Sequence, residues 1–463
     1  MTTECLAQLC ELVDPEQIRQ GSAIDSSYQK DWSNTPATCP LAVIFPHSTQ
    51  QLAAIVKVCA QFSQPIIPQG GRTGLTGAAT PYSDSICISL EKLNSIVEVD
   101  TKANSITVGA GVLLQQVQEA AQQHERYYPV DFGARGSCQI GGVLATNAGG
   151  NNVIRYGMAR ETVLGLEVVT AQGDILDLNN KMIKNNAGYD LKQLFIGSEG
   201  TLGFITQATL KLTSVPGEAR TALCAMSNYQ NGVDLLRQLQ SHLGQSIHAF
   251  EMMWLDFYSM SCDWSCPSNP PVDLDYPLYV LIECRDCSED AFNAALESAF
   301  ESELIQDAAI AASLKDREKL WAIREATTEF PIKLAPINFD ISLPIGDIDR
   351  FVQECTAKIT SRWPDAMVVN FGHIGDSNLH LTIDKNSADG IDELEADKLV
   401  YQCVEQYQGS ISAEHGIGTL KRDFLHHSVS PQSIELMRTI KQALDPKNIL
   451  NPGKLIPSQT IAR

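Results

Sequence analysis

The sequence predicts an α+β protein with two large regions that join near Pro216. Short strand-like and helix-like segments alternate between about residues 38 and 216, whereas longer helices alternate with strands from about residue 217 onward. The chain has 463 residues, which is enough for two large domains or about three of ordinary size. We therefore divide it into an N-terminal lead (1–37), a first domain (38–216) and a second domain (217–463).

The first domain is expected to contain short strands and two amphipathic helices. Residues 42–45 have the pattern of a strand that ends at Pro46, and Ser48 with Gln51 forms a capping box for the helix that follows. Apolar residues recur with helical spacing in that helix, and a second helix is expected over 112–123. The remaining expected strands cover residues 66–67, 86–90, 105–108, 163–169 and 209–212.

The second domain is expected to pair strands with longer helices. Strands are predicted over 279–283 and 367–371, and a helix over about 290–302. A helical tail over about 430–450 is followed by a turn at 451–454, which begins Asn-Pro-Gly.

The charge of the chain excludes some classes of partner. It has 34 Lys and Arg residues against 55 Asp and Glu residues, so its formal net charge is −21. Such a surface repels nucleic acid and anionic lipid, and an anionic substrate must meet local positive charge. No apolar run is long enough for a membrane-spanning helix. The acidic start has no basic region followed by an apolar one, so we expect a cytoplasmic protein.

The 13 cysteines are scattered and odd in number, which predicts reduced and mostly buried thiols. Cys262, Cys266, Cys284 and Cys287 have a spacing that faintly resembles a zinc ribbon. Cys284, however, ends an apolar strand-like run, so packing is the reading that we favour for these residues.

A glycine-rich loop follows the expected strand at 66–67. Four glycines in ten residues allow successive backbone N–H groups to converge on an anion such as a pyrophosphate. No Gly-Lys-Ser/Thr follows, and the spacing is not that of a Rossmann fingerprint. The candidate cofactor residues of this first loop are Pro68, Gln69, Gly70, Gly71, Arg72, Thr73, Gly74 and Gly77.

Two more polar glycine loops lie in the same domain, and the three together favour a large phosphorylated cofactor. Gly109-Ala110-Gly111 is a weaker signal that fits a tight turn equally well. The second loop contributes Gly136, Ser137, Gly141, Gly142, Asn147, Gly149 and Gly150, and the third contributes Glu199, Gly200 and Gly203.

The ordered set PQGGRTGLTG, GSCQIGG with NAGG, and GSEGTLG resembles the flavin-binding domain of the vanillyl-alcohol oxidase/p-cresol methylhydroxylase superfamily. The resemblance covers roughly residues 38–216 and implies FAD, with its pyrophosphate on the first loop and its isoalloxazine toward the second region. It also adds Ile205 and Asn451 to the candidate cofactor residues, and the C-terminal segment of the second domain is expected to return to the flavin. Members with covalent flavin attach it through a histidine near these loops. The first loop has Arg72 and no histidine, so we expect non-covalent FAD.

Two histidines flank a predicted hairpin in the second domain. Gly375 to Asn378 are turn formers, and a four-residue loop would place His373 opposite His380. The polar turn at 412–418 adds Glu414 beside His415. Two imidazoles and one carboxylate would suit Zn²⁺, Mn²⁺ or Fe²⁺. The alternative is a pair of packed histidines that the backbone satisfies.

GHIGDSNLH with SAEHG resembles the C-terminal domain of FAD-linked D-2-hydroxy-acid dehydrogenases, which include D-lactate and D-2-hydroxyglutarate dehydrogenases. The resemblance implies that His373, His380 and Glu414 bind a divalent metal, most readily zinc. It places His415 at the reacting carbon, where an imidazole suits a general base while hydride passes to flavin N5. Arg324 of the segment WAIRE would bind the substrate carboxylate.

Three further positions complete the candidate substrate site. Thr328 lies four residues after Arg324 and is expected on the same helix face. Members that act on hydroxyglutarate have Lys-Tyr-Asp where this chain has Asn338-Phe339-Asp340, and they have Asn at the position of Thr382. The missing lysine weakens the prediction of a dicarboxylate, and we favour hydroxyglutarate only slightly over lactate or another D-2-hydroxy acid. The candidate substrate residues are Arg324, Thr328, Asn338, Thr382 and His415.

Several alternatives remain open. A redox-neutral transferase of the alkyl-glycerone-phosphate synthase type shares the expected fold and FAD, but it needs an apolar tunnel, and the sequence has no added apolar segment. A subunit of a glycolate-oxidising complex would need an iron–sulfur partner, because this chain has no cluster motif of its own. A direct reaction of reduced flavin with O₂ would make the protein an oxidase. Electron-transfer flavoprotein, a quinone or a cytochrome could accept the electrons, and a homodimer is a further expectation.

Overall fold

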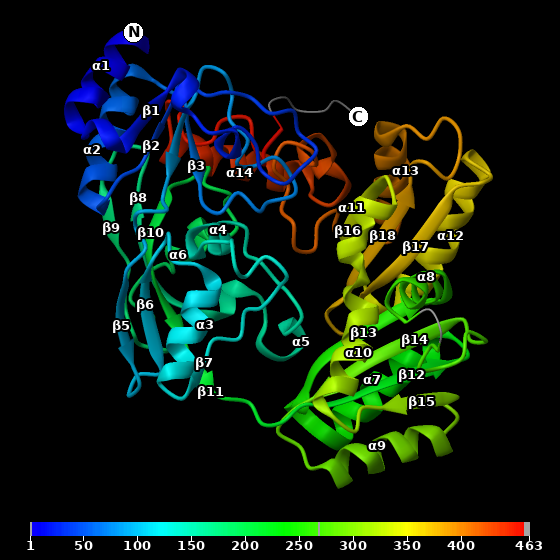
Figure 1. The fold of residues 1–463 in the computed structure, drawn as a ribbon. Coiled ribbons are helices and arrows are strands. Elements are labelled where there is room, and N and C mark those ends of the chain that lie inside the picture. Colours follow the sequence, from blue (N-terminus) through cyan, green and yellow to red (C-terminus); the bar gives the residue numbers. More distant parts are fainter. Residues whose placement is uncertain (1, 267–268, 458–463) are drawn as a thin grey trace. The chain divides into compact units, whose positions relative to one another are not determined.

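The computed structural model describes residues 2–266 and 269–457, and the chain divides into two compact units (Figure 1). The first unit contains Met1–Gly150, Tyr156–Val215 and Glu414–Arg463. The second contains Asn151–Arg155 and Pro216–Ala413. The chain therefore leaves the first unit next to Pro216, and its C-terminal part returns to that unit from Glu414 onward.

The first unit contains two sheets and a small strand pair. A four-stranded sheet has the order β1-β2-β4-β3, and its last three strands are parallel. An antiparallel sheet has the order β5-β6-β10-β8-β9, and β7 pairs with β11. The strands are β1 (Ile18–Gln20), β2 (Ala42–Ile44), β3 (Ile66–Gln69), β4 (Ile86–Ser89), β5 (Ile96–Asp100), β6 (Ser105–Gly109), β7 (Arg126–Tyr127), β8 (Val163–Val169), β9 (Ile175–Asp177), β10 (Phe204–Lys211) and β11 (Thr213–Ser214). The helices are α1 (Thr2–Leu12), α2 (Thr49–Phe62), α3 (Leu114–Gln123), α4 (Ile140–Ala145), α6 (Lys192–Phe195) and α14 (Pro431–Leu444).

Helix α2 forms where the sequence predicts it. The Ser48 hydroxyl accepts a hydrogen bond from Gln51 N at 3.1 Å and caps the helix. The other half of the predicted capping box is wrong, because the Gln51 side chain accepts from His47 N instead of Ser48 N. Leu52, Ile55 and other apolar residues of α2 are buried against strands of the four-stranded sheet.

Helix α4 corrects the prediction of a continuous second glycine loop. Residues 140–145 are helical, so Gly141 and Gly142 lie on a helix. A Cβ at Gly141 would lie 2.8 Å from Ala110 Cβ, which means that this glycine allows α4 to approach the residue after β6. The helix and α3 share one apolar core with the five-stranded sheet.

The second unit contains one antiparallel sheet of seven strands in the order β15-β12-β14-β13-β17-β18-β16. Its strands are β12 (Arg220–Met226), β13 (Ile247–Trp254), β14 (Leu278–Cys284), β15 (Asp307–Ile310), β16 (Pro336–Ser342), β17 (Met367–His373) and β18 (Asn378–Asp384). Its helices are α7 (Tyr229–Leu243), α8 (Leu255–Ser265), α9 (Glu289–Glu301), α10 (Leu314–Arg324), α11 (Phe330–Lys333), α12 (Ile348–Arg362) and α13 (Glu393–Gln406). Helix α5 (Val153–Tyr156) lies where the chain passes from one unit to the other.

Helices α8 and α10 pack on strands of this sheet around an apolar core that includes Phe257, Tyr279, Trp321 and Phe371. Strand β14 is buried along its whole length, as an apolar run predicts. The core thus holds α10, which ends at Arg324, against β12 and β14.

All 13 cysteines are free thiols, and most of them are buried. Cys284 lies in β14 and Cys262 in α8, where both are packed in the unit's interior. Among the helices in residues 2–266 and 269–457, none combines the length and the apolar character that a bilayer crossing requires.

Candidate active site

The first two glycine loops contact each other in the first unit. A Cβ at Gly71 would clash with the Ser137 carbonyl oxygen, so only glycine fits at this close approach. Gly70 lies against Gln139 and Gly142 N, each at 3.6 Å from the position of a Cβ. Gly142 itself has no heavy atom within 4 Å of that position, which leaves open space beside the contact.

Buried acceptors without partners line the same loops. Gln69 Oε1, Gln139 Oε1 and Asn451 Oδ1 are buried, and none of them has a hydrogen-bond donor in the described part of the chain. An unsatisfied buried acceptor is costly, so three of them around one set of glycines indicate a missing donor-bearing group. FAD has such donors in its ribose, adenine and isoalloxazine, and these residues therefore fit FAD.

Some of the other predicted flavin-binding residues have contacts within the protein itself. Arg72 turns back on its own loop, donates to Gly70 O at 3.1 Å and lies 4.3 Å above the Tyr28 ring. Asn147 accepts from Arg160 N at 3.0 Å, and Ile205 is buried in β10. Pro68 lies in strand β3. The remaining positions lie in the connecting segments, namely Thr73, Gly74, Gly77, Gly136, Gly149, Gly150, Gly200 and Gly203.

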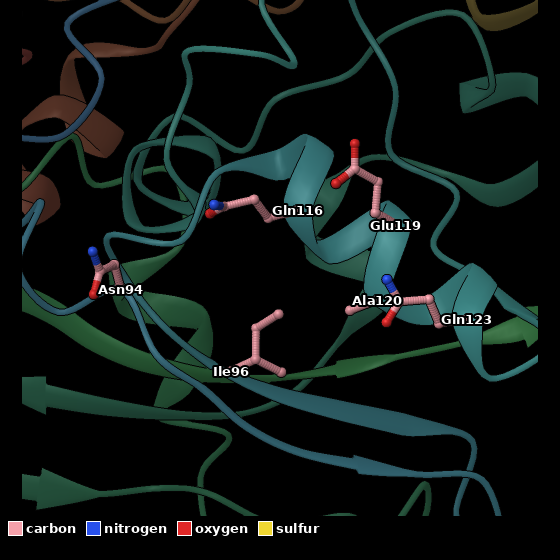
Figure 2. A pocket seen from close by; sticks show the side chains of 6 residues that line it. All are labelled: Asn94, Ile96, Gln116, Glu119, Ala120 and Gln123. Carbon is pink, nitrogen blue, oxygen red and sulfur yellow. The ribbon is translucent and has the colours of Figure 1, made fainter.

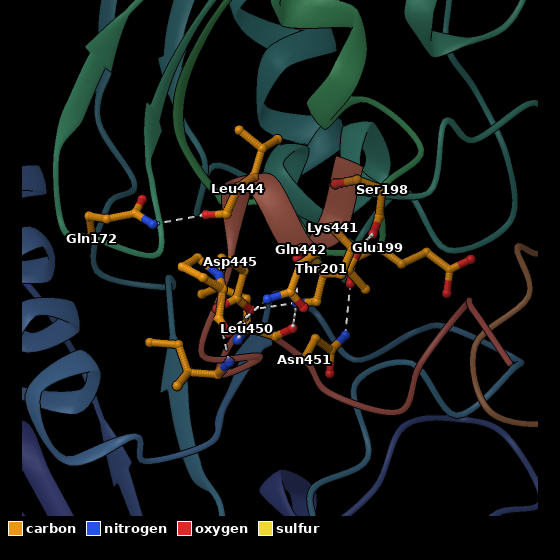
Figure 3. A network of polar contacts seen from close by, with 12 residues as sticks. Gln172, Ser198, Glu199, Thr201, Lys441, Gln442, Leu444, Asp445, Leu450 and Asn451 are labelled. Carbon is orange, nitrogen blue, oxygen red and sulfur yellow. Dashed lines mark hydrogen bonds and ion pairs between the residues drawn. The ribbon is translucent and has the colours of Figure 1, made fainter. Parts of the chain in front are cut away.

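The carboxylate of Glu199 binds the turn that contains His415. Its Oε1 accepts from Ile417 N at 2.7 Å, and its Oε2 accepts from Gly418 N at 2.8 Å. Burial raises the pKa of Glu199, and these two N–H donors act in the opposite direction. The backbone of Glu199 has a separate role, since its carbonyl oxygen accepts from Asn451 Nδ2 at 2.7 Å (Figure 3).

In the second unit the predicted register of the histidine hairpin is wrong by two residues. Phe371, not His373, pairs with His380 across β17 and β18. The connection consists of a 3₁₀ turn, Ile374–Asp376, and left-handed Ser377 at φ 73°, and the pairing of β17 with β18 ends at Phe371 and His380 before this connection is reached. A slip of two residues keeps side chains on the same face, and the two imidazole centroids are still only 5.5 Å apart.

Glu251 is a functional candidate that the sequence does not reveal. This β13 carboxylate is 1% exposed and accepts from His373 Nδ1 at 2.7 Å and from Arg324 Nε at 2.8 Å. Burial opposes its ionisation, but the interactions with His373 and Arg324 outweigh burial and hold the pKa of Glu251 at about 2. A proton on Nδ1 leaves the lone pair of His373 on Nε2, where Arg324 Nη2 lies at 3.3 Å.

His380 and Asp376 are half-buried polar residues of the same β17–β18 hairpin. His380 stacks on Phe371 with 4.9 Å between ring centroids, and its Nδ1 lies 3.9 Å from Asp340 Oδ1. Burial raises the pKa of Asp376 to about 6.

The arrangement of the histidines fits a divalent metal. One ligand atom from each of His373, His380 and Glu414 lies within 4.8 Å of the others. The Glu251 acceptor favours the His373 tautomer that has its proton on Nδ1 and its electron pair on Nε2, the arrangement found in many metal sites. Two imidazole nitrogens and a carboxylate suit zinc, manganese or iron.

Arg324 and Thr328 do not share a helix face, which corrects the prediction. Helix α10 ends at Arg324, and Thr328 lies in the 3₁₀ segment Glu325–Glu329. A 3₁₀ helix has about three residues per turn where an α-helix has about 3.6, so residues four apart no longer point in the same direction. Thr328 is exposed and donates to Glu325 O at 3.1 Å. Arg324 is 7% exposed and lies over the Phe371 ring at 4.8 Å.

Asn338 and Thr382 are direct partners. They face each other across β16 and β18, and Thr382 Oγ1 donates to Asn338 Oδ1 at 2.8 Å. The two positions at which the chain departs from the hydroxyglutarate pattern therefore form one hydrogen-bonded pair. The pair lies on the same face of the sheet as Asp340 and His380, because residues two apart along a strand place their side chains on the same face.

A shallow pocket elsewhere in the first unit has no relation to these groups (Figure 2). Its lining has no histidine and no cationic side chain, and it combines Asn94 and Ile96 with residues of α3. We assign it no function.

Comparisons with known proteins match both parts of the chain. Residues 40–179 match a family model described as FAD binding domain, and residues 215–455 match one described as FAD linked oxidases, C-terminal domain. A protein of Stutzerimonas stutzeri named D-2-hydroxyglutarate dehydrogenase is 38% identical over 97% of this chain and 98% of its own length. A Bos taurus protein named mitochondrial D-2-hydroxyglutarate dehydrogenase is 35% identical over 96% of this chain and 81% of its own.

A Schizosaccharomyces pombe protein provisionally named a mitochondrial D-lactate dehydrogenase is 35% identical over 93% of this chain and 84% of its own. Some relatives are thus named mitochondrial, and the cytoplasmic expectation stays a prediction.

Solved structures show the same fold. Substrate-bound p-cresol methylhydroxylase has a TM-score of 0.76 at 16% identity and covers 98% of this chain and 97% of its own. Alkyldihydroxyacetonephosphate synthase has a TM-score of 0.72 at 18% identity over 97% of this chain and 84% of its own. The predicted fold of the flavin-binding domain is therefore confirmed.

Proposed function

Because the chain belongs to the FAD-linked oxidases and is an oxidoreductase of CH–OH groups, we propose that it oxidises a D-2-hydroxy acid, D-2-hydroxyglutarate, to the 2-oxo acid with the assistance of a divalent metal. The observation that carries the proposal is the buried group formed by Arg324, Glu251 and His373, which joins a carboxylate-binding cation to a metal-binding imidazole. The names of the relatives support the choice of substrate.

Arg324 is the cation for the α-carboxylate. Its Nε is bound to Glu251, so the guanidinium is held in one orientation while part of its donor fork remains for a ligand. An acidic chain needs this local charge to bind an anion. Asn338 and Thr382 offer neutral hydrogen-bonding groups for the remainder of the substrate.

His415 is the proposed general base. Hydride leaves C2 only as the hydroxyl proton is removed, and an imidazole titrates near neutral pH. A metal held by His373, His380 and Glu414 would lower the hydroxyl pKa and neutralise the developing alkoxide. FAD held by the three glycine loops would supply the two-electron oxidant, and its electrons would pass to an external acceptor.

An anaerobic titration of the holoenzyme tests the proposal. D-2-hydroxyglutarate, D-lactate, D-malate, glycolate and the L-enantiomers would be added in turn while the flavin absorbance near ~450 nm is followed. We expect bleaching by D-2-hydroxyglutarate and none by its L-enantiomer. A flavin that none of these acids bleaches would refute the proposal and favour the transferase or the glycolate-complex subunit.

The neutral side chain of Asn338 is the observation that favours D-lactate as the second candidate substrate. The position has no cation for a distal carboxylate, and a relative provisionally named a D-lactate dehydrogenase is 35% identical to the chain. Bleaching by D-lactate at lower concentration than by D-2-hydroxyglutarate would select it.

A further inference from the structure

The turn that contains His415 is built on the flavin loops of the first unit. A Cβ at Gly149 of the second loop would lie 3.2 Å from Glu414 Cδ. Thr76 of the first loop donates to His415 O at 3.4 Å, and its own carbonyl accepts from Thr419 N at 2.9 Å. Glu199 of the third loop binds Ile417 and Gly418. All three loops therefore contact residues 414–419.

We propose that Glu199 is a positioning residue whose carboxylate fastens the His415 turn to the third flavin loop. The proposal rests on the proposed function, in which His415 is the base. Glu199 does not act on the substrate; it determines where the next residues of the turn place the imidazole. The same carboxylate would make the position of His415 depend on the conformation of residues 197–203.

The geometry of Glu199 suits a clamp and not a surface charge. The residue is 6% exposed, and its two oxygens accept from two successive backbone N–H groups, which fixes the direction of the turn as well as its distance. Its backbone is left-handed at φ 51°, a conformation that non-glycine residues rarely adopt without compensation.

The third loop is itself held rigidly from the other side (Figure 3). Lys441 of α14 donates to Thr201 O at 2.8 Å and to Leu450 O at 2.7 Å, while Asn451 binds the Glu199 carbonyl at 2.7 Å. In Figure 3 the Glu199 side chain extends away from this network. Because the Glu199 backbone is held in this way, its carboxylate can hold the His415 turn in a defined position.

Two glycines of the turn allow this close contact. A Cβ at Gly416, whose φ is 80°, would lie 2.8 Å from Glu199 Oε1. Gly418 has φ 53°, and its Cβ would clash with Thr76 O. At these two positions the turn presents only backbone, Gly416 toward the third loop and Gly418 toward the first.

The test uses Glu199→Gln in the holoenzyme. An amide retains one acceptor and brings an NH₂ against the other N–H, so one of the two bonds is lost. We expect kcat with D-2-hydroxyglutarate to fall roughly 10- to 100-fold, as misplacement of a reacting group produces, while KM and flavin content stay near the wild-type values. Hydrogen exchange at the amides of Ile417 and Gly418 should accelerate in the same variant.

Gly416→Ala perturbs the clamp from the turn and leaves the flavin loop unchanged. It should reproduce the lower kcat and the faster exchange, and it keeps the test available if Glu199→Gln does not fold. Gly390→Ala is the matched control, because Gly390 has a similar φ of 76° and nothing within 4 Å of its Cβ position. The control should keep the kcat and amide exchange of the wild type.

Wild-type kcat and amide protection in Glu199→Gln would overturn the proposal, as would a variant that loses only its flavin. The exchange measurement does not depend on turnover. If no D-acid reduced the wild-type flavin but the variants still released the two amides, the proposed function would fail while the clamp itself would stand.

Discussion

Replacement of Glu251 by glutamine tests the buried link between the substrate cation and the metal-binding histidine. The carboxylate accepts from Arg324 Nε at 2.8 Å and from His373 Nδ1 at 2.7 Å, and it is 1% exposed. Glutamine has almost the same volume, so the variant removes the charge without opening a cavity. It leaves the Arg324 guanidinium buried beside a neutral group.

The expected cost follows from that burial. Removal of one partner from a buried ion pair destabilises a protein by about 3–5 kcal/mol, because the other charge remains uncompensated. The amide can also turn its NH₂ toward His373 Nδ1, which would favour the other tautomer and occupy Nε2 with a proton. Loss of such an orienting partner weakens metal binding roughly 10- to 100-fold.

Denaturant unfolding and calorimetric Zn²⁺ titration of chelator-treated protein would measure the two effects. Glu283→Gln is the matched control, since Glu283 is 4% exposed and accepts from Arg317 Nε and Trp321 Nε1, each at 2.7 Å, in the same sheet. It should lose stability but keep its zinc affinity. The reasoning would be refuted if Glu251→Gln bound zinc like the wild type, or if the control weakened zinc binding equally.

Three further predictions concern other parts of the chain. His380→Ala should lose bound metal, measured by elemental analysis, while its flavin absorbance is retained; metal content equal to that of the wild type would contradict the assignment. Asn338→Lys should raise kcat/KM for D-2-hydroxyglutarate relative to D-lactate by about tenfold, the value of one added charge-assisted hydrogen bond; an unchanged ratio in steady-state assays would exclude this position from distal recognition. Burial lowers the pKa of Lys454 to about 8 from its ordinary value of 10.5, so the unfolded chain binds more protons between these pH values, and the stability of the wild type relative to Lys454→Met should rise from pH 8 to pH 10.5. Thermal unfolding of both proteins across that pH range measures this change in relative stability. A relative stability of the wild type that falls from pH 8 to pH 10.5 would contradict the prediction.

The sequence predicts much of the local structure because the responsible signals are short-range. The helix expected over 112–123 corresponds to α3, and the apolar run near Tyr279 corresponds to the buried strand β14. Glycine loops combine into a specific pattern even though each alone would be an ordinary turn. These features need only neighbouring residues to be recognised.

The remaining features depend on contacts between distant residues. Glu251 has no local signal, since it lies in an apolar strand, and its partners are 73 and 122 residues away. The return of the C-terminal segment is expected from the family resemblance, but its contacts, such as the bridge between Ile66 and Leu450, join residues far apart in the sequence. The hairpin register depends on left-handed Ser377, a conformation that the serine itself does not predict.

A single-turnover experiment with and without metal tests the central claim most directly. Holoenzyme would be treated with a chelator, mixed anaerobically with D-2-hydroxyglutarate, and then supplied with Zn²⁺ or Mn²⁺ while the flavin absorbance is recorded. We expect no reduction in the chelated enzyme and full bleaching by the D-acid after the metal is restored. Equally fast bleaching without metal would contradict the role proposed for His373, His380 and Glu414.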